Sequence, residues 1–119
     1  MHEQIKKAIG AHGLWKGRLK TAIATGKSEF TVAEVAADNN CQFGKWLYSV
    51  REASGPSDRH FENVKQLHAA FHKEVAGILA KALAGMQKEA LQAMEPGTAY
   101  ATASTDLTRE MMDWAKKAA

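Results

Sequence analysis

The sequence predicts an all-α protein, a four-helix-bundle-like domain with additional short helices. Apolar residues recur every three or four positions over several long stretches, which is the spacing of one helix face. No stretch of useful length alternates apolar and polar residues as a half-buried strand does, and there is no internal repeat. With 119 residues, 45% of them hydrophobic and 24% charged, the chain has the composition of a single globular domain spanning residues 1–119.

The first helix is predicted at residues 3–25. Its apolar face includes a histidine and consists of Ile5, Ile9, His12, Trp15, Leu19 and Ile23. Gly26 is a suitable stop. The segment from 27 to 40 is less regular, and we expect a loop with one or two helical turns and Thr31 as an N-cap.

A short helix is expected at residues 42–50, before the turn-forming sequence SGPS. Ser57 or Asp58 is then the expected N-cap of a long helix. The apolar face of that helix also includes a histidine and consists of Phe61, Val64, His68, Phe71, Val75, Ile78 and Ala82.

Gly85 interrupts this pattern, and the sequence MQKEALQAM predicts a further short helix. A break is expected at 95–97, because Pro96 cannot continue a helix without losing a backbone hydrogen bond. The last helix is predicted from the helical spacing of Tyr100, Ser104, Leu107, Met111 and Trp114.

The distribution of charge excludes some partners. The net charge of +3 arises from 16 basic and 13 acidic residues scattered along the chain, without the basic block that follows a phosphate backbone, so nucleic-acid binding is not expected. There is no run of about 18 apolar residues and no apolar core of a secretory signal near the N-terminus. A cytoplasmic protein without a membrane anchor is therefore expected.

Several residues could bind a borderline metal ion. His68 and His72 have i, i+4 spacing and share one helix face, while His12 lies in the apolar face of another helix, where a buried imidazole needs a partner. Together with Cys41, the only cysteine, they supply four nitrogen and sulfur donors, the number that tetrahedral Zn²⁺ takes. The scarcity of carboxylates among the candidates disfavours magnesium, calcium or a di-iron site.

Other interpretations of these residues stay open at this point. Cys41 could be a small buried hydrophobe and each histidine a core or surface residue with its own hydrogen bonds. His2 and His60 are left out of the site because of their positions at the terminus and on another part of the helix. An enzyme is not predicted, because a fourth protein ligand closes the zinc site and no H-E-x-x-H motif is present. A metal-free or haem-binding helical interaction module is the alternative.

Three motifs are similar to those of a known family. HGLWKGRL from His12, DNNCQFGKWL from Asp38 and HAAFH from His68 resemble the H-x-x-W-K, C-x-x-G-x-W and H-x-x-x-H signatures of the chemoreceptor zinc-binding (CZB) domain. Their order and spacing also agree, and the resemblance covers nearly the whole chain.

This resemblance implies a cytoplasmic bacterial sensory domain, a helical bundle that often forms a homodimer and holds zinc through three histidines and one cysteine. Carried over to this sequence, the ligands are His12, Cys41, His68 and His72. Such domains are usually fused to a chemoreceptor signalling module or to a cyclic-di-GMP synthase, a diguanylate cyclase. The sequence contains no such output region, so we expect a stand-alone member or an excised domain whose partner is unknown.

Cys41 is then the expected movable ligand, since the histidines lie on longer helices. Its release would report either zinc scarcity or oxidation of the thiolate by an oxidant such as hypochlorous acid. Asp38 is either a hydrogen-bond acceptor that tunes a ligand or a solvated turn residue. Packing around the site is expected from Trp15 and from Phe43, Gly44 and Trp46.

Overall fold

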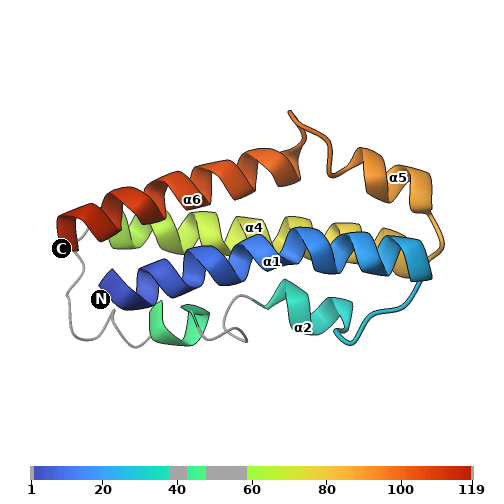
Figure 1. The fold of residues 1–119 in the computed structure, drawn as a ribbon, viewed down its shortest axis with the longest axis horizontal. Coiled ribbons are helices and arrows are strands. Elements are labelled where there is room, and N and C mark those ends of the chain that lie inside the picture. Colours follow the sequence, from blue (N-terminus) through green and yellow to red (C-terminus); the bar gives the residue numbers. More distant parts are fainter. Residues whose placement is uncertain (1, 38–42, 48–58, 119) are drawn as a thin grey trace.

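The computed structural model describes residues 2–37, 43–47 and 59–118, and three long helices dominate this part of the chain. They are α1 (His2–Thr25), α4 (Arg59–Leu83) and α6 (Ala99–Ala118). The three lie side by side along the longest dimension of a body measuring 44 × 25 × 20 Å (Figure 1). The described residues contain no strand, and the predicted all-α class is confirmed.

The central helix of the bundle is α4, which contacts α1, α2, α5 and α6. Its buried face is wide because successive turns meet different neighbours. The face consists of Phe61, Val64, His68, Phe71, His72, Val75, Ala76, Ile78, Leu79 and Ala82. Each large apolar side chain buried here contributes roughly 1.5–3 kcal/mol to folding, and the two histidines of α4 are buried among these side chains.

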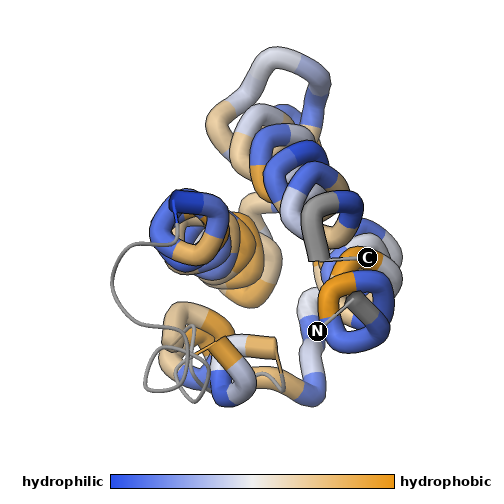
Figure 2. The backbone as a smooth tube through the Cα atoms, turned by 90° about the vertical axis from the view of Figure 1, so that its left-hand side faces the viewer, coloured by the Kyte–Doolittle hydropathy of each residue, from blue (hydrophilic) through white to orange (hydrophobic). Residues whose placement is uncertain are grey.

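Short segments make up the fourth side of the bundle. They are α2 (Val32–Ala36) and a helical turn at residues 43–47, both seen below the long helices in Figure 1. Viewed from the end in Figure 2, the hydrophobic positions gather toward the middle, between the long helices and these short segments. The apolar side chains Val35, Phe43 and Leu47 are 3%, 6% and 2% exposed and attach the short segments to the core.

Several helix ends lie where the sequence predicts them. Gly26 and Gly85 adopt positive φ values of 71° and 79°, which glycine reaches without strain, directly after α1 and shortly after α4. Thr31 is the N-cap of α2, as predicted, and it forms a capping box with Glu34. The predicted short helix after Gly85 is α5 (Gln87–Gln92).

Two predictions concern residues that lie partly or wholly outside the described part of the chain. Of the helix expected at 42–50, the structure describes residues 43–47, and these are helical. The expected N-caps of the long helix, Ser57 and Asp58, lie outside the described residues, and α4 is described from Arg59 onward. None of the described helices combines the length and the apolar composition that a membrane crossing requires.

Candidate metal centre

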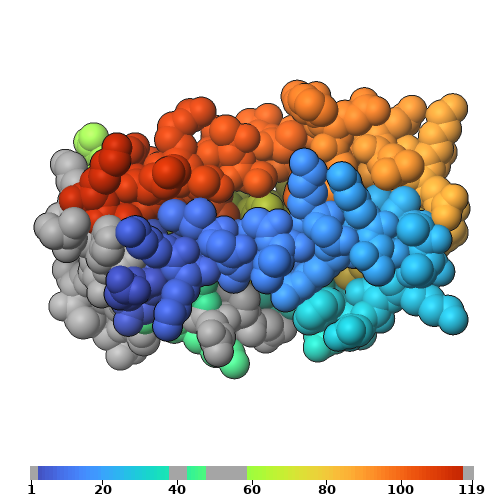
Figure 3. Space-filling view, viewed as in Figure 1, coloured from blue at the N-terminus to red at the C-terminus, as the bar shows by residue number. Residues whose placement is uncertain are grey.

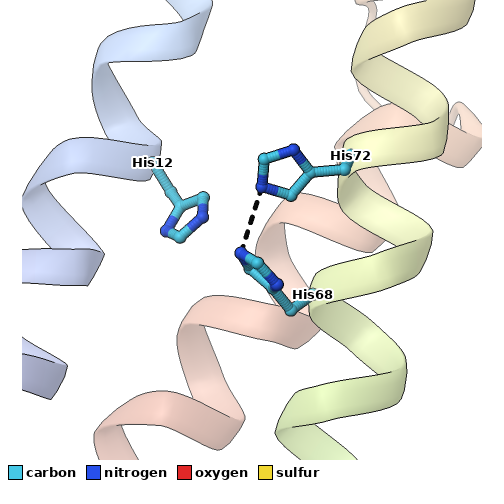
Figure 4. A group of neighbouring side chains, drawn as sticks. All are labelled: His12, His68 and His72. Atoms are coloured by element: carbon cyan, nitrogen blue, oxygen red, sulfur yellow. Dashed lines mark hydrogen bonds between the residues drawn. The ribbon is translucent and has the colours of Figure 1, made fainter. Parts of the chain in front are cut away.

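Three histidines from two helices meet inside the bundle. His12 comes from α1, while His68 and His72 come from successive turns of α4, and Figure 4 shows their rings turned toward one another. One nitrogen from each ring can be chosen so that all three lie within 4.8 Å of one another. The residues are 8%, 0% and 3% exposed, respectively, so this is a buried cluster of nitrogen donors.

The backbone of α1 fixes the ring of His12. Its Nδ1 lies 2.7 Å from the carbonyl oxygen of Ala8, one turn earlier in the same helix. A carbonyl oxygen can only accept, so Nδ1 carries the proton and donates it. The lone pair of the neutral ring is therefore on Nε2, the atom available to a metal ion.

A different element fixes His72. Its Nδ1 donates a hydrogen bond of 2.9 Å to the carbonyl oxygen of Val35 in α2. Its Nε2 then carries the lone pair and accepts a hydrogen bond of 3.0 Å from Nε2 of His68, the contact drawn as a dashed line in Figure 4. Backbone acceptors of this kind are the usual partners of metal-binding histidines, because they set the tautomer and orient the ring.

Burial keeps two of the three rings neutral. It lowers the pKa of His12 from 6.5 to about 4, although the hydrogen bond to Ala8 opposes this, and a charge on His72 would lower it further. The pKa of His68 is lowered from 6.5 to about 2, chiefly by burial and then by the neighbouring His72 and His12. Both imidazoles are therefore uncharged at pH 7, the form that binds a metal.

The geometry of the cluster fits zinc. In a tetrahedral site with Zn–N distances of about 2.0–2.1 Å, neighbouring donor atoms lie about 3.3 Å apart. The 3.0 Å separation in the His68–His72 pair is close to this value, and the 4.8 Å limit on the whole group requires only small ring movements. Among the described residues, the group consists of three imidazoles without a carboxylate, a donor set that suits zinc better than magnesium or calcium.

The family model of the chemoreceptor zinc-binding domain matches residues 12–79 of this sequence, more than half of the chain. The chain belongs to the chemoreceptor zinc-binding domain family. It is therefore a zinc-binding signalling domain, and the sequence resemblance is confirmed. The match begins at His12 and includes His68 and His72. No curated protein and no solved structure matches the chain.

Aromatic rings surround the histidines of this CZB domain. Phe43 and Phe71 make edge contacts with the ring of His12, with centroid separations of 5.8 and 5.3 Å. Phe43 also contacts His68 at 5.2 Å. These apolar walls exclude water from two sides and account for much of the burial that lowers the histidine pKa values.

The other residues expected to pack around the site lie close to these walls. Trp46 stacks on Phe43 with a centroid separation of 5.6 Å, and Gly44 is buried in the same turn. Trp15 lines a cavity that also reaches His12 and His72, and its ring lies 5.2 Å from that of Phe30.

Two expected site residues, Asp38 and Cys41, lie outside the described residues. The structure instead identifies partners that the sequence did not reveal, namely the carbonyl groups of Ala8 and Val35. Every residue carries a backbone carbonyl group, so no sequence signal marks these acceptors. His60, which is not predicted to belong to the site, bonds through Nδ1 to Glu110 of α6 at 3.0 Å.

Proposed function

We propose that this protein is a cytoplasmic bacterial sensor in which His12, His68, His72 and Cys41 hold one zinc ion. The observation that supports this most strongly is the convergence of three buried imidazoles from α1 and α4. A structural role alone would not require three mutually facing rings in an apolar core, where unpaired nitrogens are costly. Membership in a zinc-binding signalling family points the same way.

Cys41 is proposed as the fourth ligand. Three imidazoles leave one position of a tetrahedron, and a structural zinc site closes it with a protein donor. Phe43 contacts the rings of His12 and His68, and two residues of chain span at most about 7 Å between Cα atoms. A sulfur donor at residue 41 is therefore compatible with the length of chain that separates it from Phe43.

Asp38 is proposed to tune the site. The Nδ1 atoms of His12 and His72 already donate to backbone carbonyls, which restricts a supporting role of Asp38 to His68 or to the thiolate. Such a carboxylate would raise the basicity of the group that it contacts.

Release of Cys41 is the proposed signalling step. When bound, zinc supplies the positive charge that keeps the thiol deprotonated at neutral pH. Zinc scarcity would leave the donors without their shared ion. Alternatively, hypochlorous acid would take two electrons from the sulfur to give a sulfenic acid and chloride, and a sulfenic acid is a poorer ligand. Both triggers would loosen the side of the bundle formed by α2 and residues 43–47.

The proposed output is a changed contact with a signalling partner of the chemoreceptor or diguanylate cyclase type, without catalysis by this domain. We also propose that the domain acts as a homodimer. Sedimentation with and without a chelator tests this part, since a monomer under both conditions would exclude a zinc-dependent dimer.

Metal analysis tests the ligand set. Protein purified without a histidine tag should contain about one zinc per chain, and His68→Ala should lower zinc affinity by at least about a hundredfold, because even loss of a supporting hydrogen bond costs 10–100-fold. His60→Ala is the matched control on the same helix and should retain zinc. A metal-free wild-type protein, or equal zinc loss in both variants, would contradict the proposal.

Cobalt substitution tests the role of Cys41. Tetrahedral Co²⁺ bound to a thiolate gives a sulfur-to-metal charge-transfer band, which should be present in the wild type and absent in Cys41→Ser. If the band is absent from the wild type, Cys41 is not a ligand.

Substoichiometric hypochlorous acid should release zinc from the wild type. Retention of both zinc and reduced thiol would leave zinc availability as the trigger.

A further inference from the structure

A cavity of about 430 Å³ leads to the histidine cluster between α1, α2 and residues 43–47. It exists because α2 packs against α4 while no Cα atom of α2 comes within 8 Å of one in α1. Both His12 and His72 line it. Much of its wall consists of four aromatic side chains, namely Trp15, Phe30, Phe43 and Trp46. We call this space the α1–α2 cavity.

Positive charge lines the α1–α2 cavity. Lys7 and Arg18 are exposed cations of α1 in its lining. The guanidinium of Arg18 lies 4.9 Å from the ring centre of Trp15 and 5.2 Å from that of Phe30, which holds it against the cavity wall. Glu34 also lines the cavity, and its carboxylate offsets one of the two cations, so that the lining carries a net charge of +1. The lining therefore favours anions.

A second cavity, of about 590 Å³, reaches His12 between α1 and α6. We call it the α1–α6 cavity, and Figure 3 shows the hollow between these two helices. Its lining contains one cation, Lys16, and one carboxylate, Asp106, and it does not include His72. The two cavities thus differ in charge and in how many histidines they reach.

We propose that the α1–α2 cavity is the port through which metal exchanges, and that its cationic lining is a docking site for anionic metal chelates rather than for the hydrated dication. The inference rests on the proposed histidine ligands. A buried donor set needs a path from solvent, and this cavity exposes two of the three imidazoles to one space. His68 is 0% exposed and lines neither cavity, so it is reached last.

Electrostatics gives this port a preference. With Glu34 offsetting one of the two cations, the lining is still net positive, so it repels a hydrated divalent cation and attracts a chelate or chelator with a net negative charge. His12 and His72 would be the first imidazoles to meet such a carrier, since both line the cavity and the Nδ1 of each is bonded to a carbonyl oxygen, which leaves Nε2 for a metal ion.

The charge dependence is tested by zinc release from the full zinc-loaded chain into excess EDTA, which is anionic, or TPEN, which is neutral. Lys7→Glu combined with Arg18→Glu should slow release to EDTA about tenfold at low salt and change release to TPEN less than twofold, and high salt should reduce the difference. Lys16→Glu is the control in the α1–α6 cavity and should leave both rates unchanged. Equal effects on the two chelators would overturn the proposed preference for anions.

A steric test uses the same substitution in each cavity. Ala11 is exposed and lines the α1–α2 cavity, so Ala11→Trp should slow release to both chelators severalfold. Ala101→Trp fills the α1–α6 cavity and should have no such effect. The reverse pattern, or unchanged rates in both variants, would overturn the port. The zinc content of the wild type distinguishes failure of the port from failure of the proposed ligands. If the proposed ligands are wrong, the wild type contains no zinc, whereas a wrong port leaves about one zinc per chain.

Discussion

At the scale of single residues, the decisive feature is which nitrogen of each ring carries a proton. The Nδ1 atoms of His12 and His72 donate to backbone carbonyls, so their Nε2 atoms face the cluster as acceptors. Burial keeps His12 and His68 uncharged in the same way that it disfavours any isolated charge. Two of the three rings thus present a lone pair to the cluster before an ion is bound.

Acidification should destabilise the metal-free protein. The unfolded chain takes up protons at His12 and His68 below pH 6.5, whereas the folded chain does not until about pH 4 for His12 and about pH 2 for His68. The unfolded state therefore binds more protons in this window, and each group lowers the free energy of unfolding by up to about 1.4 kcal/mol per pH unit.

Denaturant unfolding of the metal-free protein between pH 7 and pH 4.5 measures this slope. His12→Gln should have a shallower slope than the wild type, because one of the two groups is gone. Identical slopes in the two proteins would show that His12 titrates normally in the folded state.

At the scale of elements, α2 has a larger role than its five residues suggest. A helix this short has no stability of its own, so its position depends on the Thr31–Glu34 capping box and on burial of Val35. The carbonyl group of Val35 orients His72, so the capping box is linked to the metal centre through one hydrogen bond.

Thr31→Ala should therefore affect both stability and zinc binding. Loss of the cap should cost about 1 kcal/mol in the free energy of unfolding, and looser support of His72 should weaken zinc binding about tenfold. Thermal unfolding and a competitive zinc titration measure the two effects. Thr98→Ala is the matched control, since the Thr98 hydroxyl accepts a hydrogen bond from the backbone of Ala101 near the start of α6. If both variants bind zinc equally well, α2 does not support the site.

At the scale of the whole molecule, the candidate centre joins elements far apart in sequence. Its rings come from α1 and α4, a carbonyl group of α2 holds one of them, and Phe43 covers the cluster. A bound ion would therefore stabilise several parts of the bundle together, including the side built only from short segments.

Zinc removal should lower the melting temperature. At a free zinc concentration a hundred times the Kd, binding to the folded state alone adds about 2.7 kcal/mol. For a domain of this size that corresponds to a shift of roughly 10 °C. Thermal unfolding with zinc and with a chelator measures the shift, which should be absent in His72→Gln. Equal melting temperatures in the wild type under both conditions would mean that zinc does not bind the folded core.

Much of this architecture can be read from the sequence. The spacing of apolar residues predicts the three long helices, Gly26 and Gly85 mark helix ends, and Thr31 marks a cap, because each of these signals acts over a few neighbouring residues. The placement of His12 and His68 on apolar faces likewise predicts buried imidazoles, and both are buried. The roles of Cys41 and Asp38 stay predictions.

Only the tertiary structure determines how these pieces meet. The distance between His12 and the α4 histidines, the choice of Ala8 and Val35 as acceptors, and the cavity left between α1 and α2 depend on how helices pack across long separations in sequence. Backbone carbonyls and empty space have no residue type, so no pattern in a sequence can mark them. The sequence by itself determined which residues could bind zinc, and the packing of the bundle decided which atoms of the three histidines face one another.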